Sequence, residues 1–110
     1  MLRSLYIANY ALIDETDILL GKGLNILTGE TGAGKSLLLG AIGLILGRRV
    51  DYGFIFNPDK KCVVEAIFEN IPVETANELK KFEDFDWDEA HLVIRREAAA
   101  DSKSRAFIND

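Results

Sequence analysis

The stretch "GETGAGKS", residues 29–36, decides the fold of this 110-residue chain. It fits the pattern Gly-x-x-x-x-Gly-Lys-Ser/Thr, whose glycines let consecutive backbone N–H groups turn inward and form a concave anion site. The pattern requires a strand before it and a helix after it. The sequence supplies both, because "LNILT" at 24–28 is typical of a buried strand and "SLLLGAIGLIL" at 36–46 is rich in helix formers and lacks proline. Residues 29–36 are therefore predicted to be a phosphate-binding loop.

The loop itself provides the candidate nucleotide-binding residues, which are Gly29, Glu30, Thr31, Gly32, Ala33, Gly34, Lys35 and Ser36. A helix that begins near Lys35 adds unpaired N–H groups and the positive end of its dipole. The Lys35 ammonium is expected to reach the β- and γ-phosphates, which makes Lys35 the candidate catalytic residue. The Ser36 hydroxyl is expected to bind Mg²⁺. The structural alternative is a glycine-rich turn with a solvated lysine.

The motif leaves the reaction open, because small-molecule kinases, GTPases, helicases and ABC-type ATPases all use it. Hydrolysis also needs a carboxylate, normally at the end of a later strand, that holds Mg²⁺ and polarises the attacking water. No expected strand ends in a convincing pattern of an apolar run followed by an acid. Glu65 lies mid-strand and Glu97 follows two arginines, so both are interpreted as strand-face residues. The chain stops after "SRAFIND", and we expect it to be an N-terminal piece of a longer protein.

The rest of the chain alternates between strand-like and helix-like segments. Two strands, joined by a tight connection near Asn9 and Tyr10, are expected at 2–9 and 11–20. Further elements are expected as strands at 61–69, 91–97 and 104–109, a helix over 73–82 that opens after Pro72, and a loop over 51–60.

The helix that follows the loop is apolar on nearly all sides, which predicts a buried helix rather than a surface one. Gly40 and Gly43 cost helix propensity but would let a neighbouring element approach closely. Gly47 is a natural C-terminal stop, and Arg48 and Arg49 after it favour the negative end of the helix dipole.

Charge and cysteine content narrow the function classes. Residues 1–50 carry five basic and four acidic side chains, so the overall charge of -5 is concentrated in the remainder, and a dominant nucleic-acid surface is not expected. Cys62 is the only cysteine, which excludes a disulfide within the chain and a cysteine-based zinc cluster; we interpret it as a buried small hydrophobe. The sequence has neither a signal-peptide pattern nor a run of about 20 apolar residues, so a cytoplasmic location is expected.

Several stretches resemble the N-terminal region of the RecN family of bacterial DNA repair proteins, which are SMC-like members of the ABC ATPase superfamily. These stretches are "IANYALID" at 7–14, "GLNILTGETGAGKS" at 23–36, "LGRR" at 46–49, "CVVEAIF" at 62–68, "LVIRRE" at 92–97 and "SRAFIN" at 104–109. The sequence departs from the family at Gly40, where an acid is common, and at Arg48 and Ser102, where glycines are common.

The resemblance implies an α/β fold, that of a P-loop NTPase, with antiparallel β strands packed around the P-loop helix in the N-terminal lobe of an ABC/SMC-type head. Residues 1–110 would form an incomplete lobe that lacks the coiled coil and the C-terminal lobe. In the family, the C-terminal lobe supplies the signature motif, the Mg²⁺-binding aspartate and the catalytic glutamate. Arg49 matches an arginine that lies near the nucleotide or DNA side in SMC-like heads, although a helix-capping arginine is an equal alternative.

The implied function is that of the ATP-binding lobe of an ATPase in DNA double-strand break repair and recombination. ATP binding would close a dimer of heads and hydrolysis would reopen it. The implied partners are ATP, Mg²⁺, DNA through the full-length protein, the protein's own C-terminal lobe and a second head in a homodimer, with no membrane partner. A cytoplasmic, nucleoid-associated protein is implied, and the fragment alone should be inactive as an ATPase.

Two other functions are alternatives. DEAH-type nucleic-acid helicases use a similar loop, but there a threonine and a glutamine follow it, whereas Leu37 and Leu38 follow here. An antiparallel pair of strands at the start is also wrong for that fold. The other alternative is a nucleotide-binding module that hydrolyses nothing.

Overall fold

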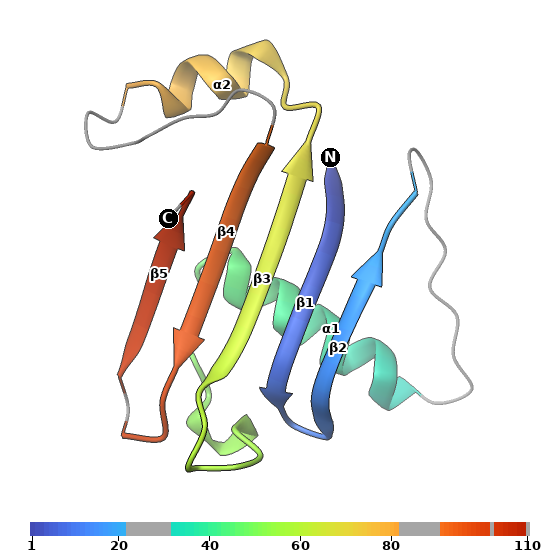
Figure 1. Ribbon diagram of the computed structural model, residues 1–110, viewed down its shortest axis with the longest axis vertical. Coiled ribbons are helices and arrows are strands. Elements are labelled where there is room, and N and C mark those ends of the chain that lie inside the picture. The colour runs from blue at the N-terminus through green and yellow to red at the C-terminus, as the bar shows by residue number, and fades with distance from the viewer. Residues whose placement is uncertain (22–31, 82–90, 102, 110) are drawn as a thin grey trace.

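The structure is a computed structural model that describes residues 1–21, 32–81, 91–101 and 103–109. Five strands form one antiparallel sheet in the order β2-β1-β3-β4-β5, and α1 crosses behind it (Figure 1). The elements are β1 (Leu2–Tyr10), β2 (Ile13–Leu19), α1 (Gly32–Ile45), the 3₁₀ turn η1 (Tyr52–Phe54), β3 (Cys62–Glu69), α2 (Val73–Leu79), β4 (His91–Ala98) and β5 (Ser104–Ile108). This is the expected arrangement of antiparallel strands packed on a helix.

Most expected elements are present with small shifts at their ends. The first hairpin turns two residues later than expected, since Tyr10 pairs with Ile13 and Ala11 adopts a left-handed backbone with φ 49°. The loop over 51–60 contains η1, and α2 ends at Leu79. The strand expected at 24–28 lies outside the described residues. Among the described residues, no helix is long and apolar enough to span a bilayer.

The core lies between one face of the sheet and α1. Side chains alternate between the two faces of a strand, and every second residue of β1 and β3 points to the helix. The inward positions Leu5, Ile7 and Val64 are almost fully buried. Each such side chain contributes about 1.5–3 kcal/mol to stability through removal of apolar surface from water. From the helix, Ala41, Leu44 and Ile45 complete this core.

Full burial of α1, predicted from its composition, is wrong for the described part of the chain. Leu39 is 64% exposed and Leu46 is 74% exposed, whereas Ala41 is fully buried. A helix laid on one face of a sheet buries only the stripe that faces the sheet. The described residues place no other element over the opposite side of α1, so its apolar side chains there remain open.

The C-terminus of α1 ends in a Schellman motif, as the position of Gly47 predicts. Gly47 has φ 92°, its N–H donates to the Leu44 carbonyl at 3.2 Å, and the Arg48 N–H donates to the Gly43 carbonyl at 3.0 Å. This double hydrogen bond requires a left-handed residue at the first position, which glycine adopts without steric cost. The stop signal read from the sequence is confirmed.

Asn9 anchors the loop that precedes β3 to the end of β1. Asn9 is buried, with φ 56°, and its amide nitrogen donates to the carbonyls of Asn57 and Lys60, both at 2.9 Å. Its side-chain oxygen accepts the Asn57 N–H at 2.8 Å. Asparagine tolerates the left-handed region better than most residues, and here all of these contacts satisfy a side chain that would otherwise be costly to bury.

Gly40 allows β1 and α1 to come into close contact. A Cβ at position 40 would collide with the hydroxyl oxygen of Tyr10, whose ring is buried at the end of β1. The close approach expected at this glycine is confirmed. The contact fixes the distance between the middle of α1 and the first hairpin.

Gly40→Ala should lower the free energy of unfolding by up to about 2 kcal/mol, because overpacking costs about 1–3 kcal/mol and the gain in helix propensity is about 1 kcal/mol. In a Tyr10→Phe background, where the colliding oxygen is gone, Gly40→Ala should be neutral or stabilising. Urea unfolding of the wild type, both single variants and the double variant measures this change of sign. An equal cost of Gly40→Ala in both backgrounds would show that the hydroxyl is not the obstacle.

Candidate functional site

The predicted phosphate loop leads directly into the N-terminal end of α1. Residues 29–31 lie outside the described part of the chain, so the positions of Gly29, Glu30 and Thr31 stay predictions. Residues 32–34 form the first turn of α1, which begins about one turn earlier than expected. Glycine costs little in a first turn, where the N–H groups have no intrahelical partner in any case. Lys35 and Ser36 follow, and both are exposed.

The charge at this end of α1 suits an anion. The first turn contains no acidic residue that would complement the positive end of the helix dipole. Lys35 adds a further positive charge where the dipole disfavours one. Among the described residues, no carboxylate forms an ion pair with Lys35. Within the described ranges, neither the positive dipole end nor the Lys35 ammonium is neutralised by a carboxylate, which suits a negatively charged ligand.

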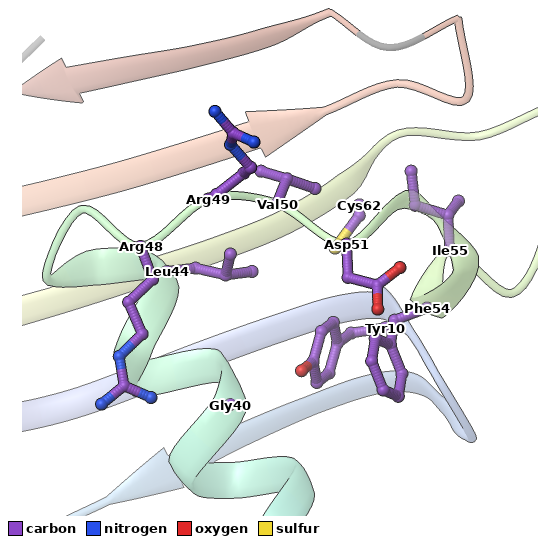
Figure 2. A pocket seen from close by; sticks show the side chains of 10 residues that line it. All are labelled: Tyr10, Gly40, Leu44, Arg48, Arg49, Val50, Asp51, Phe54, Ile55 and Cys62. Carbon is purple, nitrogen blue, oxygen red and sulfur yellow. The ribbon is translucent and has the colours of Figure 1, made fainter.

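A pocket of about 160 Å³ lies beside α1, between the helix and the loop that follows it (Figure 2). Its wall includes the stacked rings of Tyr10 and Phe54, whose centroids lie 5.7 Å apart. The Asp51 carboxylate also lines it and accepts the hydrogen bond that caps η1. The helical wall consists of Gly40 and Leu44, and the nearer of the two to Lys35, Gly40, lies five residues beyond it, or about 8 Å along the axis. The pocket thus flanks the helix and does not lie at its phosphate end.

The two arginines after α1 point in opposite directions (Figure 2). The Arg48 side chain turns back along the helix, where a Cβ on Gly43 would lie 2.8 Å from its Cδ. Arg49 is exposed and points the other way. A different arginine, Arg96 of β4, donates to the carbonyls at the end of α1. The capping role considered for Arg49 therefore belongs to Arg96, which the sequence interpretation missed.

The acidic side chains of the central strands serve the sheet. Glu65 lies 4.0 Å from Arg95, and Glu97 lies 2.7 Å from Arg95 and 3.5 Å from Lys61. Their strand positions alternate with the buried core residues, so they lie on the face turned away from α1. Their interpretation as strand-face residues is confirmed. Among the described residues, no group of three His, Cys, Asp or Glu side chains could hold a metal ion.

Cys62 is buried at the start of β3, as predicted, and lines the pocket beside Tyr10. Burial disfavours the thiolate and raises the pKa of the Cys62 thiol to about 11. The pKa of the Tyr10 hydroxyl is also raised, first by burial and then by the nearby Cys62 and Asp51. Both groups therefore remain protonated and neutral at neutral pH.

Comparison with known proteins shows which family this sequence belongs to. A family model described as an AAA domain matches residues 4–85. The DNA repair protein RecN of Haemophilus influenzae is 36% identical over 115 residues, which cover 99% of this chain and 20% of that protein. RecN proteins of other bacteria match at 33% to 53% identity, so the resemblance to RecN is confirmed. The chain spans about a fifth of the length of the curated relatives that it matches.

Solved SMC structures share the fold. An SMC head bound to the C-winged helix domain of ScpA has a TM-score of 0.74 and 25% identity, covering 98% of this chain and 35% of that one. A structure described under ATP-driven dimerization and DNA-stimulated activation of SMC ATPases has a TM-score of 0.73 and 24% identity, covering 98% and 69%. The expected fold class, a lobe of an SMC-type ATPase head, is confirmed.

The raised pKa of Cys62 predicts slow alkylation of the native protein. At pH 9 the thiolate fraction should be at least about 50-fold lower than in an ordinary thiol. Because the pKa of this thiol is higher in the folded than in the unfolded protein, the unfolded state loses the proton first as pH rises. The stability that this thiol contributes to the free energy of unfolding should therefore be fully present below pH 9 and be lost between pH 9 and about 11. Iodoacetamide labelling of the peptide that contains Cys62, with and without urea, measures the difference. Equal rates in both states would contradict the burial of this thiol.

Proposed function

Because the chain belongs to the AAA domain family, we propose that it is the ATP-binding lobe of a RecN-like ATPase that acts in DNA double-strand break repair and recombination. The observation that carries the proposal is the N-terminal end of α1. There a complete phosphate-loop sequence leads into a helix end that has no acidic residue in its first turn and an unpaired Lys35 among the described residues. The relatives named as DNA repair proteins supply the biological setting.

In this proposal the loop residues bind the phosphates of ATP. The backbone N–H groups of Gly29, Glu30, Thr31, Gly32, Ala33 and Gly34 would surround the phosphate oxygens. The Lys35 ammonium would lie on the β- and γ-phosphates and stabilise the charge that develops there in the transition state. Lys35 is the only one of these groups that we assign a catalytic role.

The residues present also fit a magnesium ion. A bound Mg²⁺ would supply positive charge that neutralises part of the charge on the phosphates of ATP. Ser36 is exposed at the first turns of α1, directly after Lys35, and its hydroxyl would be the protein ligand that this chain provides. A Mg²⁺ held mainly by phosphates and water needs no further carboxylate from this part of the protein.

The rest of the protein would complete the head. The open side of α1 presents Leu39. Leu46, directly after the helix, is also exposed and lines a small apolar pocket with residues that include Leu2, Ile42 and Phe68. Apolar surface of this kind supports the proposal that residues 1–110 are an incomplete domain and that a C-terminal lobe covers α1. That lobe would also bring the groups that activate water, since no suitable carboxylate is found among the described residues.

The proposed working unit is a homodimer of heads. ATP bound to one lobe would be closed over by the second head, and hydrolysis would release it. A solved structure of the same fold is described in terms of ATP-driven dimerization and DNA-stimulated activation, which supports this cycle and a DNA partner for the full-length protein. The bacterial relatives support a place in the cytoplasm, associated with the nucleoid.

Lys35→Ala in the full-length protein should reduce ATP hydrolysis at least about 100-fold, because a preorganised charge on the transferred phosphoryl group is lost. Lys60→Ala is the matched control, since Lys60 is also an exposed lysine but lies in the loop before β3. It should hydrolyse ATP at the wild-type rate. Near-normal turnover by Lys35→Ala would remove the phosphate-loop assignment.

The isolated 110-residue chain should show no ATP hydrolysis above background, because in this proposal the second head and the C-terminal lobe supply the groups that activate water. A phosphate-release assay on the isolated chain and the full-length protein, at equal concentrations, tests this. Comparable turnover of the two would show that a complete catalytic site exists within these residues.

A further inference from the structure

Arg96 connects the β4–β5 hairpin to the end of α1. Its Nη1 donates to the Leu44 carbonyl at 2.9 Å and to the Arg48 carbonyl at 3.2 Å. Its Nη2 and Nε donate to the Ser104 hydroxyl oxygen at 3.0 and 3.3 Å. One planar guanidinium on β4 thus joins β5 to the last turn of α1 and to the loop directly after it.

The position of this charge is favourable for α1. The last carbonyls of a helix have no intrahelical partners and form the negative end of its dipole. The Schellman motif uses carbonyls of Gly43 and Leu44, and Arg96 adds a charged donor to Leu44. A charged donor forms a stronger hydrogen bond than a neutral one, and the fork of arginine also holds its direction. Arg96 therefore fixes this end of α1 against the sheet.

The same helix bears the proposed phosphate loop at its other end. From Leu44 back to Lys35 is nine residues, or about 14 Å of α-helix. The middle of the helix is held by the contact of Gly40 with Tyr10 of β1. A hydrogen-bonded helix held at its middle and its end has little freedom to tilt or slide, so the direction of its N-terminal N–H groups is also set.

We propose that Arg96 is a positioning residue for nucleotide binding. By holding the C-terminal end of α1 to β4 and β5, it keeps the helix in the orientation in which Lys35 and the first-turn N–H groups meet the phosphates. The inference rests on the proposed function, since it concerns the same phosphate site. Ser104 supports Arg96, because its hydroxyl oxygen accepts hydrogen bonds from Nη2 and Nε of the guanidinium.

The neighbouring Arg95 provides a matched control. It is in the same strand, but its side chain lies on the opposite face, where Nη2 donates to Glu97 at 2.7 Å. Removing either arginine removes one positive charge and its contacts within the sheet, which are to Glu65 and Glu97 for Arg95 and to Ser104 for Arg96. Only removal of Arg96 affects the end of α1, so a difference between the two variants isolates the effect on the helix.

The test is the affinity of the full-length protein for a fluorescent ATP analogue with Mg²⁺. Arg96→Met should weaken binding about tenfold, within the usual range of coupling between two sites. Arg96→Lys should restore part of the affinity, because an ammonium keeps the charge near the carbonyls but cannot reach Ser104 at the same time. Ser104→Ala, a milder change, should weaken binding by a smaller factor. Arg95→Met should bind as the wild type does.

Hydrogen exchange gives a second readout. Coupling between sites is reciprocal, so nucleotide at the N-terminal end should slow amide exchange at Gly47 and Arg48 in the wild type. In Arg96→Met this slowing should be lost. A simple loss of fold stability would raise exchange throughout the chain and would not remove the response to nucleotide.

The outcomes separate the two proposals. If the wild type binds nucleotide no better than Lys35→Ala, the phosphate-loop assignment is wrong and the role of Arg96 with it. If Lys35→Ala loses binding but Arg96→Met and Ser104→Ala both retain it, only the positioning role is wrong. If Arg96→Met and Arg95→Met weaken binding equally, the effect is general destabilisation, which also overturns the positioning role.

Discussion

The structure depends on the burial of one stripe of α1 against β1 and β3. Ala41, Leu44 and Ile45 contact a layer of strand residues, of which Ile7 and Val64 are fully buried. A helix of this length would be marginal alone in water, and an isolated sheet face of this kind would expose its apolar side chains. Each therefore stabilises the other. The direction of α1 across the sheet then determines where the groups at the two ends of the helix lie.

Much of this fold could be predicted because local signals and tertiary demands agree. The strands have the alternation of a half-buried sheet, and Gly47 provides the one backbone conformation that a Schellman motif needs. The nucleotide-site prediction rests on the motif at 29–36, which is informative because its residue types follow from phosphate chemistry. The similarity of this chain to RecN proteins could also be recognised from the sequence, since the match extends through nearly the whole chain.

The remaining features depend on tertiary geometry that a sequence does not state. Alternation alone assigns Arg95 and Arg96 to opposite faces, but which carbonyls Arg96 meets depends on the angle at which α1 crosses the sheet. The exposure of Leu39 similarly depends on what covers the far side of the helix, and no periodicity within α1 marks that side. Gly40 was recognisable as a site of close approach, yet the sequence did not identify Tyr10 as the neighbour.

The anchor formed by Asn9 has a consequence for how this chain can vary over evolution. All of its hydrogen-bond partners in the loop are backbone groups of Asn57 and Lys60, and none is a side chain. The loop can therefore exchange its residues while keeping its path, provided that position 9 remains asparagine. A substitution in the loop that keeps its backbone path would leave this anchor intact, whereas a substitution at position 9 would remove all three hydrogen bonds at once.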